Sequence, residues 1–512
     1  MALLKSIMTI SGHTMISRIL GYVRESLIAT YVGANAITDA LNIAIKIPSL
    51  FRRLFAEGAF NAAFVPMFSG NLATKGKQSA KVFAEHSIVI LGLFLTVMVL
   101  VIELFMPEFI GLLAAGFSKT PERLELAIEF TRITFPFILF ISISAILGGV
   151  LNSLEKFAAP AAAASIGNLC IIFVIYFFVN SGKSPGHVLS WGVLFSSICQ
   201  LAWLYFFCAY AGMPLKFRVP KLTPEMKEFF RKLLPGMVGA GILQINLVVD
   251  MRLCSYLPEA SVSYLNLADR INQFPLSMVG VAMGVALLPL LSKQLRQGNL
   301  NEAITTQNRA TELVLFLTLP AAIAFVIYAD LFVSLLYGYG KFLDHPGNIP
   351  QTARTLAAFS FGLPAYVMVK VFSSTFFARS DTLTPVIIGL ISVVVNIVIN
   401  LYLMGPYQHV GIAMGTAIAS WINAILLIIV LQKRRMFVFD SQFLSRIPKI
   451  LCASAIMGVV IYCIQPYFDV YIVGGSVLGK IDVLFALLFA SAISFLTPAY
   501  FLKCIDLKNI RK

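Results

Sequence analysis

The stretch that decides the fold is TDALNIAIKIPSLFRRLFAEGAFNAAFVPMFS, residues 38–69. It is apolar enough to enter a membrane, yet on a helix one of its faces stays polar over about 27 Å, close to the thickness of the hydrocarbon layer. Charge at that depth is costly unless it faces water, a partner or a substrate, so this polar stripe is predicted to line a cavity. The alternative is a set of ion pairs that only holds helices together. The stripe consists of Asp39, Asn42, Lys46, Ser49, Arg53 and Glu57, with Arg52 beside it.

The composition places the stripe in an all-α polytopic membrane protein. Of 512 residues, 59% are hydrophobic and 12% are charged, and the mean hydropathy is +0.86. A membrane β-barrel would alternate apolar and polar residues, and this chain does not. The apolar runs predict about fourteen transmembrane helices, with single runs at 37–69, 124–154 and 352–378.

Charge and cysteine usage exclude several other classes. The net charge is +15, but no basic block is joined to aromatic residues on a soluble domain, so no nucleic-acid partner is expected. The seven cysteines form no CxxC pair and the five histidines are scattered. We therefore expect no metal site and no cofactor.

The basic residues also predict the orientation. If the N-terminus is cytoplasmic, the inner loops hold most Lys and Arg, including clusters at 216–232 and 433–435, while the outer loops hold few. By the positive-inside rule both termini are then cytoplasmic.

An internal repeat divides the chain. LNIAIKI at 41–47 matches LNLADRI at 265–271, an offset of 224. Helices one to six (1–221) thus correspond to helices seven to twelve (222–436), and 437–512 adds two further helices and a tail. A shift by 224 carries the stripe onto a second polar face, and the two polar faces are expected to meet across a central cavity. The second face consists of Ser263, Asn266, Arg270, Gln273 and Ser277.

The first helix adds Ser17, Arg18, Arg24 and Glu25. Glu25 lies seven residues after Arg18 and is its candidate ion-pair partner. A guanidinium is always charged and offers a fork of donors that suits phosphate. The arginines and Lys46 outnumber the acids, including Asp269, so the predicted substrate is an anion such as a pyrophosphate.

Two further predictions concern gating and ion coupling. An unpaired Asp39 would repel a pyrophosphate, so an arginine should hold it, and Arg24 is the expected partner. Asn396, Asn400 and Thr416, with Asp250, are a candidate cation site because oxygen ligands in a membrane can hold a cation. Ordinary polar contacts between helices are the alternative for these four residues.

Several motifs resemble one known family. SRILGYVRES at 17–26, the stretch 38–66, ADRINQFP at 268–275 and ARSDTLTP at 378–385 look like the MurJ/MviN lipid II flippases of the MATE-like exporter superfamily. The resemblance covers essentially the whole chain, and the segment from Lys46 to Pro66 is its most specific part.

The resemblance implies a fold, a function and a location. It implies two six-helix lobes, a V-shaped cavity, alternating access, and export of undecaprenyl-pyrophosphoryl-disaccharide-pentapeptide (lipid II) across the bacterial inner membrane for cell-wall synthesis. It also implies a monomer among membrane lipids, with the two extra helices forming a groove for the polyprenyl tail. Gln273 stands where some relatives are expected to carry an acid, which puts a carboxylate role there in doubt. The family's cavity residues match Arg18, Arg24, Asp39 and Arg270, surrounded by Ser17, Lys46, Arg52, Arg53 and Glu57.

Two other functions remain open from the sequence. One is a related transporter, either a flippase for another polyprenyl-linked oligosaccharide or a drug/cation antiporter, although an antiporter should favour acids over arginines and needs no extra helices. The other is a membrane-embedded glycosyltransferase or ligase. Such enzymes need carboxylates and a sizeable outer loop, and the outer loops are short and hold no paired acids. A transporter is therefore predicted, not an enzyme.

Overall fold

The computed structural model describes residues 2–54, 59–216, 218–221, 223–474 and 477–504. Within these residues it contains α-helices and short 3-10 helices and no strand, which confirms the predicted all-α class. The helices divide into two compact units.

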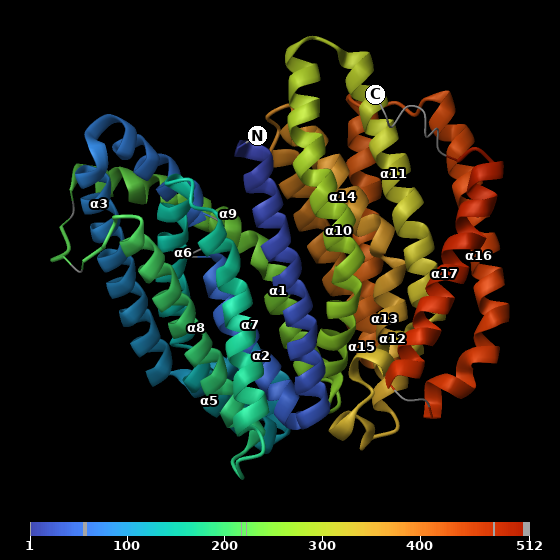
Figure 1. The fold of residues 1–512 in the computed structure, drawn as a ribbon, viewed down its shortest axis with the longest axis horizontal. Helices are drawn as coiled ribbons and strands as arrows, with labels where there is room; N and C mark the ends of the chain where they lie inside the picture. The colour runs from blue at the N-terminus through green and yellow to red at the C-terminus, as the bar shows by residue number, and fades with distance from the viewer. Residues whose placement is uncertain (1, 55–58, 217, 222, 475–476, 505–512) are drawn as a thin grey trace. The chain divides into compact units, whose positions relative to one another are not determined.

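The first unit contains residues up to Ser263 together with Gly340–Asp344. Figure 1 shows α7 beside both α1 and α8, and the contacts also join α2 to α5 and α3 to α6 and α9. Its elements are α1 (Ala2–Val32), α2 (Ala36–Arg52), α3 (Ala59–Leu104), α4 (Met106–Leu113), η2 (Ala115–Lys119), α5 (Pro121–Thr134), α6 (Phe137–Ser153), α7 (Ala158–Phe178), α8 (Pro185–Tyr210), α9 (Pro224–Ser255) and η3 (Gly340–Leu343).

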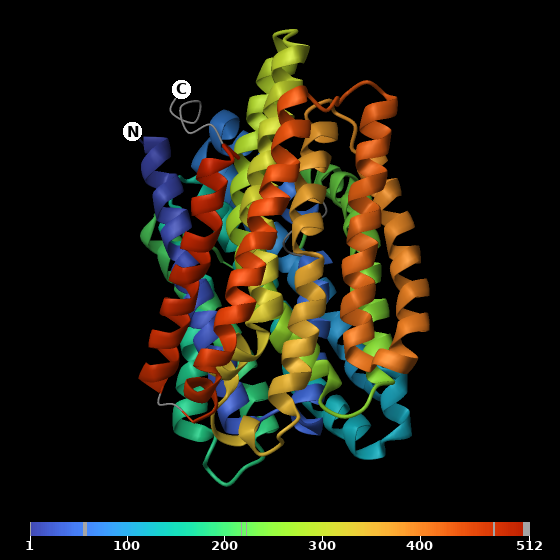
Figure 2. The same cartoon turned by 90° about the vertical axis from the view of Figure 1, so that its right-hand side faces the viewer.

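The second unit contains Tyr264–Tyr339 and His345–Lys512. The helices α16 and α17 run side by side in Figures 1 and 2 and share an apolar core with α11 and α12 that includes Tyr328, Ile450 and Leu487. Its elements are α10 (Ser261–Arg296), α11 (Leu300–Ile327), α12 (Ala329–Tyr337), α13 (Asn348–Phe361), α14 (Leu363–Phe377), α15 (Leu383–Lys433), α16 (Ser441–Gly474) and α17 (Val477–Phe501).

The compact units therefore divide at Ser263, whereas the repeat places the lobe boundary at 221/222. The helix α9 accounts for the difference, since it packs on α3 in the first unit. The lobes 1–221 and 222–436 with the segment 437–512 describe the sequence repeat and stay a prediction.

Two predicted helical runs are interrupted among the described residues, and a third crosses residues that the structure does not describe. The run 37–69 falls on α2 up to Arg52 and on α3 from Ala59, and residues 55–58 between them lie outside the described residues, so its continuity stays a prediction. The run 124–154 breaks before Phe137, because Pro136 lacks an amide proton to continue the helical ladder. The run 352–378 breaks at Gly362, whose lack of a Cβ leaves room for the Tyr366 ring and the Ala417 backbone.

Many of these helices are long enough to span a membrane. In the part of the chain that the structure describes, nine segments are long and apolar enough to cross a membrane. Two of them join a pair of consecutive helices, and Leu383–Lys433 contains a reversal at Gln408, where φ is +51°. The more polar helices α1, α2, α9 and α10 fall outside this set. The total of about fourteen spanning helices stays a prediction.

Candidate substrate-binding and gating residues

Two predicted residues of α1 share a partner on α7. The Arg24 guanidinium donates to Asn168 Oδ1 at 3.0 Å. The Asn168 amide donates to the backbone oxygen of Ser17 at 3.0 Å. Asn168 therefore holds Arg24 in place from a helix far away in sequence. The sequence analysis missed this residue, because a single Asn within an apolar run carries no pattern of its own.

Glu25, the acidic residue predicted on α1, has a different ion-pair partner from the predicted one. Glu25 is buried, and its carboxylate accepts from Arg24 Nη2 at 2.6 Å. Arg18, the predicted partner, lies about 10.5 Å before it along the axis, farther than the helical neighbours three and four residues apart that usually pair. Glu25 thus neutralises and orients Arg24, and the predicted Arg18–Glu25 pair is wrong.

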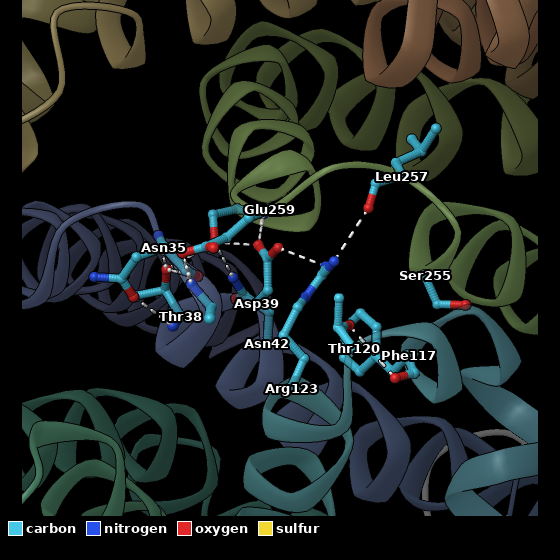
Figure 3. Close-up of polar contacts among 12 residues, drawn as sticks. Asn35, Thr38, Asp39, Asn42, Phe117, Thr120, Arg123, Ser255, Leu257 and Glu259 are labelled. Carbon is cyan, nitrogen blue, oxygen red and sulfur yellow. Dashed lines mark hydrogen bonds and ion pairs between the residues drawn. The ribbon is translucent and has the colours of Figure 1, made fainter.

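Asp39 lies at the centre of a buried polar cluster (Figure 3). It belongs to the first turn of α2, which begins with a capping box formed by Asn35 and Thr38. The Asp39 side chain is fully buried and accepts from Arg123 Nη2 at 2.9 Å. Its other oxygen accepts from the backbone amide of Ser263 at 2.9 Å and from the Ser263 hydroxyl at 2.7 Å. The carboxylate is therefore held by one charge and two further donors.

Arg123 connects this cluster to neighbouring elements. It comes from the first turn of α5, donates to the backbone oxygen of Leu257 at 3.1 Å, and lies over the ring of Phe117 at 4.2 Å. Nearby, the Gly116 amide donates to the Ser255 hydroxyl at 2.8 Å. A Cβ at Gly116 would come within 2.3 Å of the Ser255 backbone. Glycine is therefore required for this close approach of η2 to the end of α9.

The expected arginine partner of Asp39 is thus present, but it is Arg123 and not Arg24. Arg24 is engaged by Asn168 and Glu25 on a different part of α1. The prediction of an Asp39–Arg24 pair is wrong because proximity along the chain favoured Arg24, whereas the fold brings α5 against α2. The one available signal was a lone arginine just before the apolar run 124–154.

Positions related by the repeat meet in this cluster. Asp39 and Ser263 are 224 residues apart, the same offset that relates LNIAIKI to LNLADRI. The Ser263 hydroxyl also lies 2.9 Å from Thr38 Oγ1 and 3.4 Å from Asn42 Nδ2. The start of the first polar face therefore contacts the start of the second.

The residues of the polar stripe that follow Asp39 are more exposed to solvent than Asp39 itself. Lys46 and Arg52 are half-buried and Arg53, at the end of α2, is exposed. The Ser49 hydroxyl donates to the Ile45 carbonyl of its own helix at 2.9 Å. Glu57 lies outside the described residues.

Apart from Ser263, the predicted residues of α10 belong to the second unit. Arg270 and Asp269 are half-buried, and Asp269 accepts from Gln273 at 2.5 Å. Gln273, where an acid was expected in some relatives, thus serves as a hydrogen-bond donor here.

Three residues of the candidate cation site lie together on α15. Asn400 Nδ2 donates to Asn396 Oδ1 at 3.1 Å, and Asn396 Nδ2 lies 3.4 Å from Thr416 Oγ1. A Cβ at Gly415 would come within 1.9 Å of Asn400 Oδ1, so this packing requires glycine. Asp250 belongs to the other unit and accepts from Asn246 at 3.0 Å. Cation binding at these residues stays a prediction.

The motif ARSDTLTP forms the turn between α14 and α15. Asp381 accepts from the Thr384 amide at 3.0 Å and from the Thr384 hydroxyl at 2.7 Å, and it pairs with Arg434 at 2.7 Å. These donors, the Thr384 amide first, hold the pKa of Asp381 below its ordinary value. The motif is therefore explained by the local structure of the turn.

Comparison with known proteins gives a consistent result. The family model described as lipid II flippase MurJ matches residues 28–481. A protein of Rhizobium meliloti named probable lipid II flippase MurJ is 40% identical over 90% of this chain and 86% of its own length. One of Burkholderia cenocepacia named lipid II flippase MurJ is 30% identical over 92% of this chain and 91% of its own.

Solved structures agree with the sequence relatives. A lipid II flippase MurJ in an inward closed conformation superposes with a TM-score of 0.80 at 27% identity, covering 96% of this chain and 98% of that one. An inward-facing MATE multidrug transporter of the MOP superfamily gives a TM-score of 0.68 at 15% identity over 84% of this chain, which shows a shared fold. The resemblance predicted from the motifs is confirmed.

Proposed function

Because this chain belongs to the lipid II flippase MurJ family, we propose that it moves lipid II from the cytoplasmic to the outer leaflet of the bacterial inner membrane by alternating access. Lipid II is the polyprenyl-pyrophosphate-linked precursor of peptidoglycan. The chain is a multi-pass membrane protein, and its relatives are named as flippases and not as enzymes. The distribution of Lys and Arg supports a cytoplasmic location for both termini.

The observation that best supports a pyrophosphate site is that the buried acids of the first unit are already paired with arginines. Asp39 is neutralised by Arg123 and Glu25 by Arg24. Among the described residues, no carboxylate lies within ion-pair distance of Arg18 or Lys46. A cavity lined by these cations would carry a positive charge that the paired acids do not cancel, and such a charge favours an anion with concentrated charge.

Arg24 is the residue best prepared to bind that anion. Its side chain is 21% exposed, and Asn168 and Glu25 fix the guanidinium from two sides. A preorganised fork loses little rotamer freedom when it binds a phosphate. We propose that Arg24, with Arg18, Lys46 and Arg270, binds the pyrophosphate, while Arg52, Arg53, Ser17, Asn42 and Ser49 line the same cavity.

The Asp39 cluster supports a gating role. It ties the start of α2 to α5 and to Ser263 in the first turn of α10 through buried charge-assisted hydrogen bonds. Opening at this end must break those bonds, so the cluster would keep the outer end closed while the substrate enters from the cytoplasm. This proposal keeps the predicted gate and replaces Arg24 by Arg123 as its cationic half.

The last two helices are proposed to hold the polyprenyl tail. Val459, Tyr462, Phe485 and Phe489 expose large apolar surfaces on α16 and α17. Such surfaces suit a long isoprenoid chain, which a polar cavity excludes.

Complementation tests the function in cells. This chain is expressed in a bacterium whose own lipid II flippase can be depleted, and the lipid-linked precursor is measured on each side of the membrane. We expect growth and export to be restored. Accumulation of precursor on the cytoplasmic side, with the chain present in the membrane at normal abundance, contradicts the proposal.

A further inference from the structure

A groove on the first unit lies outside the residues proposed for transport. It has a volume of about 720 Å³ and is formed by the end of α7, the turn that follows, and the first turns of α8. Val174, Val188, Trp191 and Phe195 give it an apolar floor, and Lys183 with Ser184 forms a polar end. Its volume lies within the range of about 300–1,000 Å³ that is common for small-molecule sites.

The sequence explains why the helices leave this hollow. Gly192 of α8 faces Val174 of α7, and a Cβ at Gly192 would come 3.0 Å from a Val174 methyl carbon. The missing side chain lets the helices approach closely at this level and leaves space beside it. Trp191 and Phe195 remain 60% and 46% exposed along the groove. The apolar part of the groove therefore faces outward from the unit.

The position of the groove suits a lipid that lies at the membrane surface. One candidate span ends at Phe178 and the next begins at Pro185, so we expect the turn 179–184 to lie at a membrane boundary. Tryptophan is enriched at that level, with its ring among acyl chains and its N–H near headgroups. Lysine at the same level is attracted to anionic headgroups.

The polar end of the groove carries the positive charge of Lys183. Lys183 is exposed, and no carboxylate of a described residue lies within ion-pair distance of it. The Ser184 side chain makes no capping bond to α8. The neighbouring acid, Glu129, is engaged by His187 at 3.1 Å, and the His187 ring lies edge-on to Phe130. Lys183 and Ser184 thus remain as donors at the end of an apolar groove.

We propose that this groove binds an anionic glycerophospholipid, with its phosphate at Lys183 and Ser184 and one acyl chain along Val188, Trp191 and Phe195. By the predicted topology it belongs to the outer leaflet. A zwitterionic lipid brings its own cation close to Lys183, so the anionic lipid should bind about fivefold better, the factor expected for one lysine near a charged surface.

Fluorescence quenching of Trp191 tests the proposal. The full chain with Trp203→Phe and Trp421→Phe keeps only Trp191 and is reconstituted in vesicles containing brominated phosphatidylglycerol or brominated phosphatidylcholine. Half-maximal quenching is expected at about a fivefold lower mole fraction of the anionic lipid. Lys183→Ala should abolish that preference. Lys341→Ala, which removes another exposed lysine of the same unit, should leave it unchanged.

A second readout does not depend on the tryptophan substitutions. Native mass spectrometry of the unsubstituted chain should show one retained phosphatidylglycerol that is lost in Lys183→Ala. Equal quenching by the two lipids in the Trp191 protein overturns the proposal, and so does a preference that survives Lys183→Ala. A Trp421-only variant with the same lipid preference would also overturn it, because the preference would then belong to the whole protein surface.

Discussion

Replacing Asp39 by asparagine should release the outer end of the first unit. Asp39→Asn preserves the size of the side chain and an acceptor for Ser263, but it leaves the Arg123 guanidinium buried without a counter-ion. The two side chains are 0% and 7% exposed, so solvent screens them little. Removing one partner of such a pair costs about 3–5 kcal/mol. At about 1.4 kcal/mol for each factor of ten, the equilibrium should shift more than about a hundredfold towards states in which Arg123 reaches water.

Cysteine accessibility measures this shift. In a cysteine-free background, Asn42→Cys places a thiol on the half-buried face of α2 next to the cluster. An impermeant maleimide added from outside should label it much faster in Asp39→Asn than in the parent, and lipid II export should fall. Glu122→Gln is the matched control, because it removes an exposed acid beside Arg123 and should change neither quantity.

The double variant Asp39→Asn/Arg123→Met completes the cycle. Removing both charges leaves no buried ion, so the double variant should be closer to the parent in labelling than the sum of the two single variants predicts. An unchanged labelling rate and unchanged export in Asp39→Asn would refute the gating role of this cluster.

Three other variants test separate parts of the structure. Arg24→Ala should abolish complementation at normal membrane abundance. Arg24→Lys should restore complementation only in part, because an ammonium lacks the bidentate donor geometry of a guanidinium. Full activity of Arg24→Ala would show that Arg24 does not bind the pyrophosphate. Gly415→Ala should lower the Tm of the purified protein, at a cost of about 1–3 kcal/mol for overpacking against Asn400, and an unchanged Tm would contradict the close packing. Asp250→Ala should reduce any stimulation of vesicle transport by a sodium gradient, and transport indifferent to both the gradient and the substitution would dismiss the candidate cation site.

The helical class and the main apolar segments follow from composition and hydropathy, because long apolar runs in a membrane can satisfy their backbone only as helices. The breaks near Phe137 and Gly362 were harder to predict. Hydropathy does not change at these points, and the interruption depends on one proline or on close packing. Within Leu383–Lys433 the direction of the chain changes at Gln408, the residue with positive φ inside an otherwise helical segment.

The candidate site shows the same limit. Periodicity placed Asp39 on a polar face, and electrostatics required an arginine beside it. Both statements concern local sequence and the cost of buried charge. The choice of Arg123 depends on how α5 packs against α2, and the bridging role of Asn168 depends on how α7 packs against α1. Neither packing relation is encoded in the spacing of residues along one helix, although the repeat offset did relate Asp39 to Ser263, which it contacts.

Transport of lipid II by the purified full chain in vesicles tests the central claim most directly. Labelled lipid II is placed in one leaflet, and its appearance in the other is followed with an impermeant quencher, while its covalent integrity is checked by mass spectrometry. The account predicts that intact lipid II crosses faster than in protein-free vesicles, and that Arg24→Ala lowers the rate to that background. A rate equal to protein-free vesicles with folded protein present, or a covalently altered lipid as the product, would contradict it.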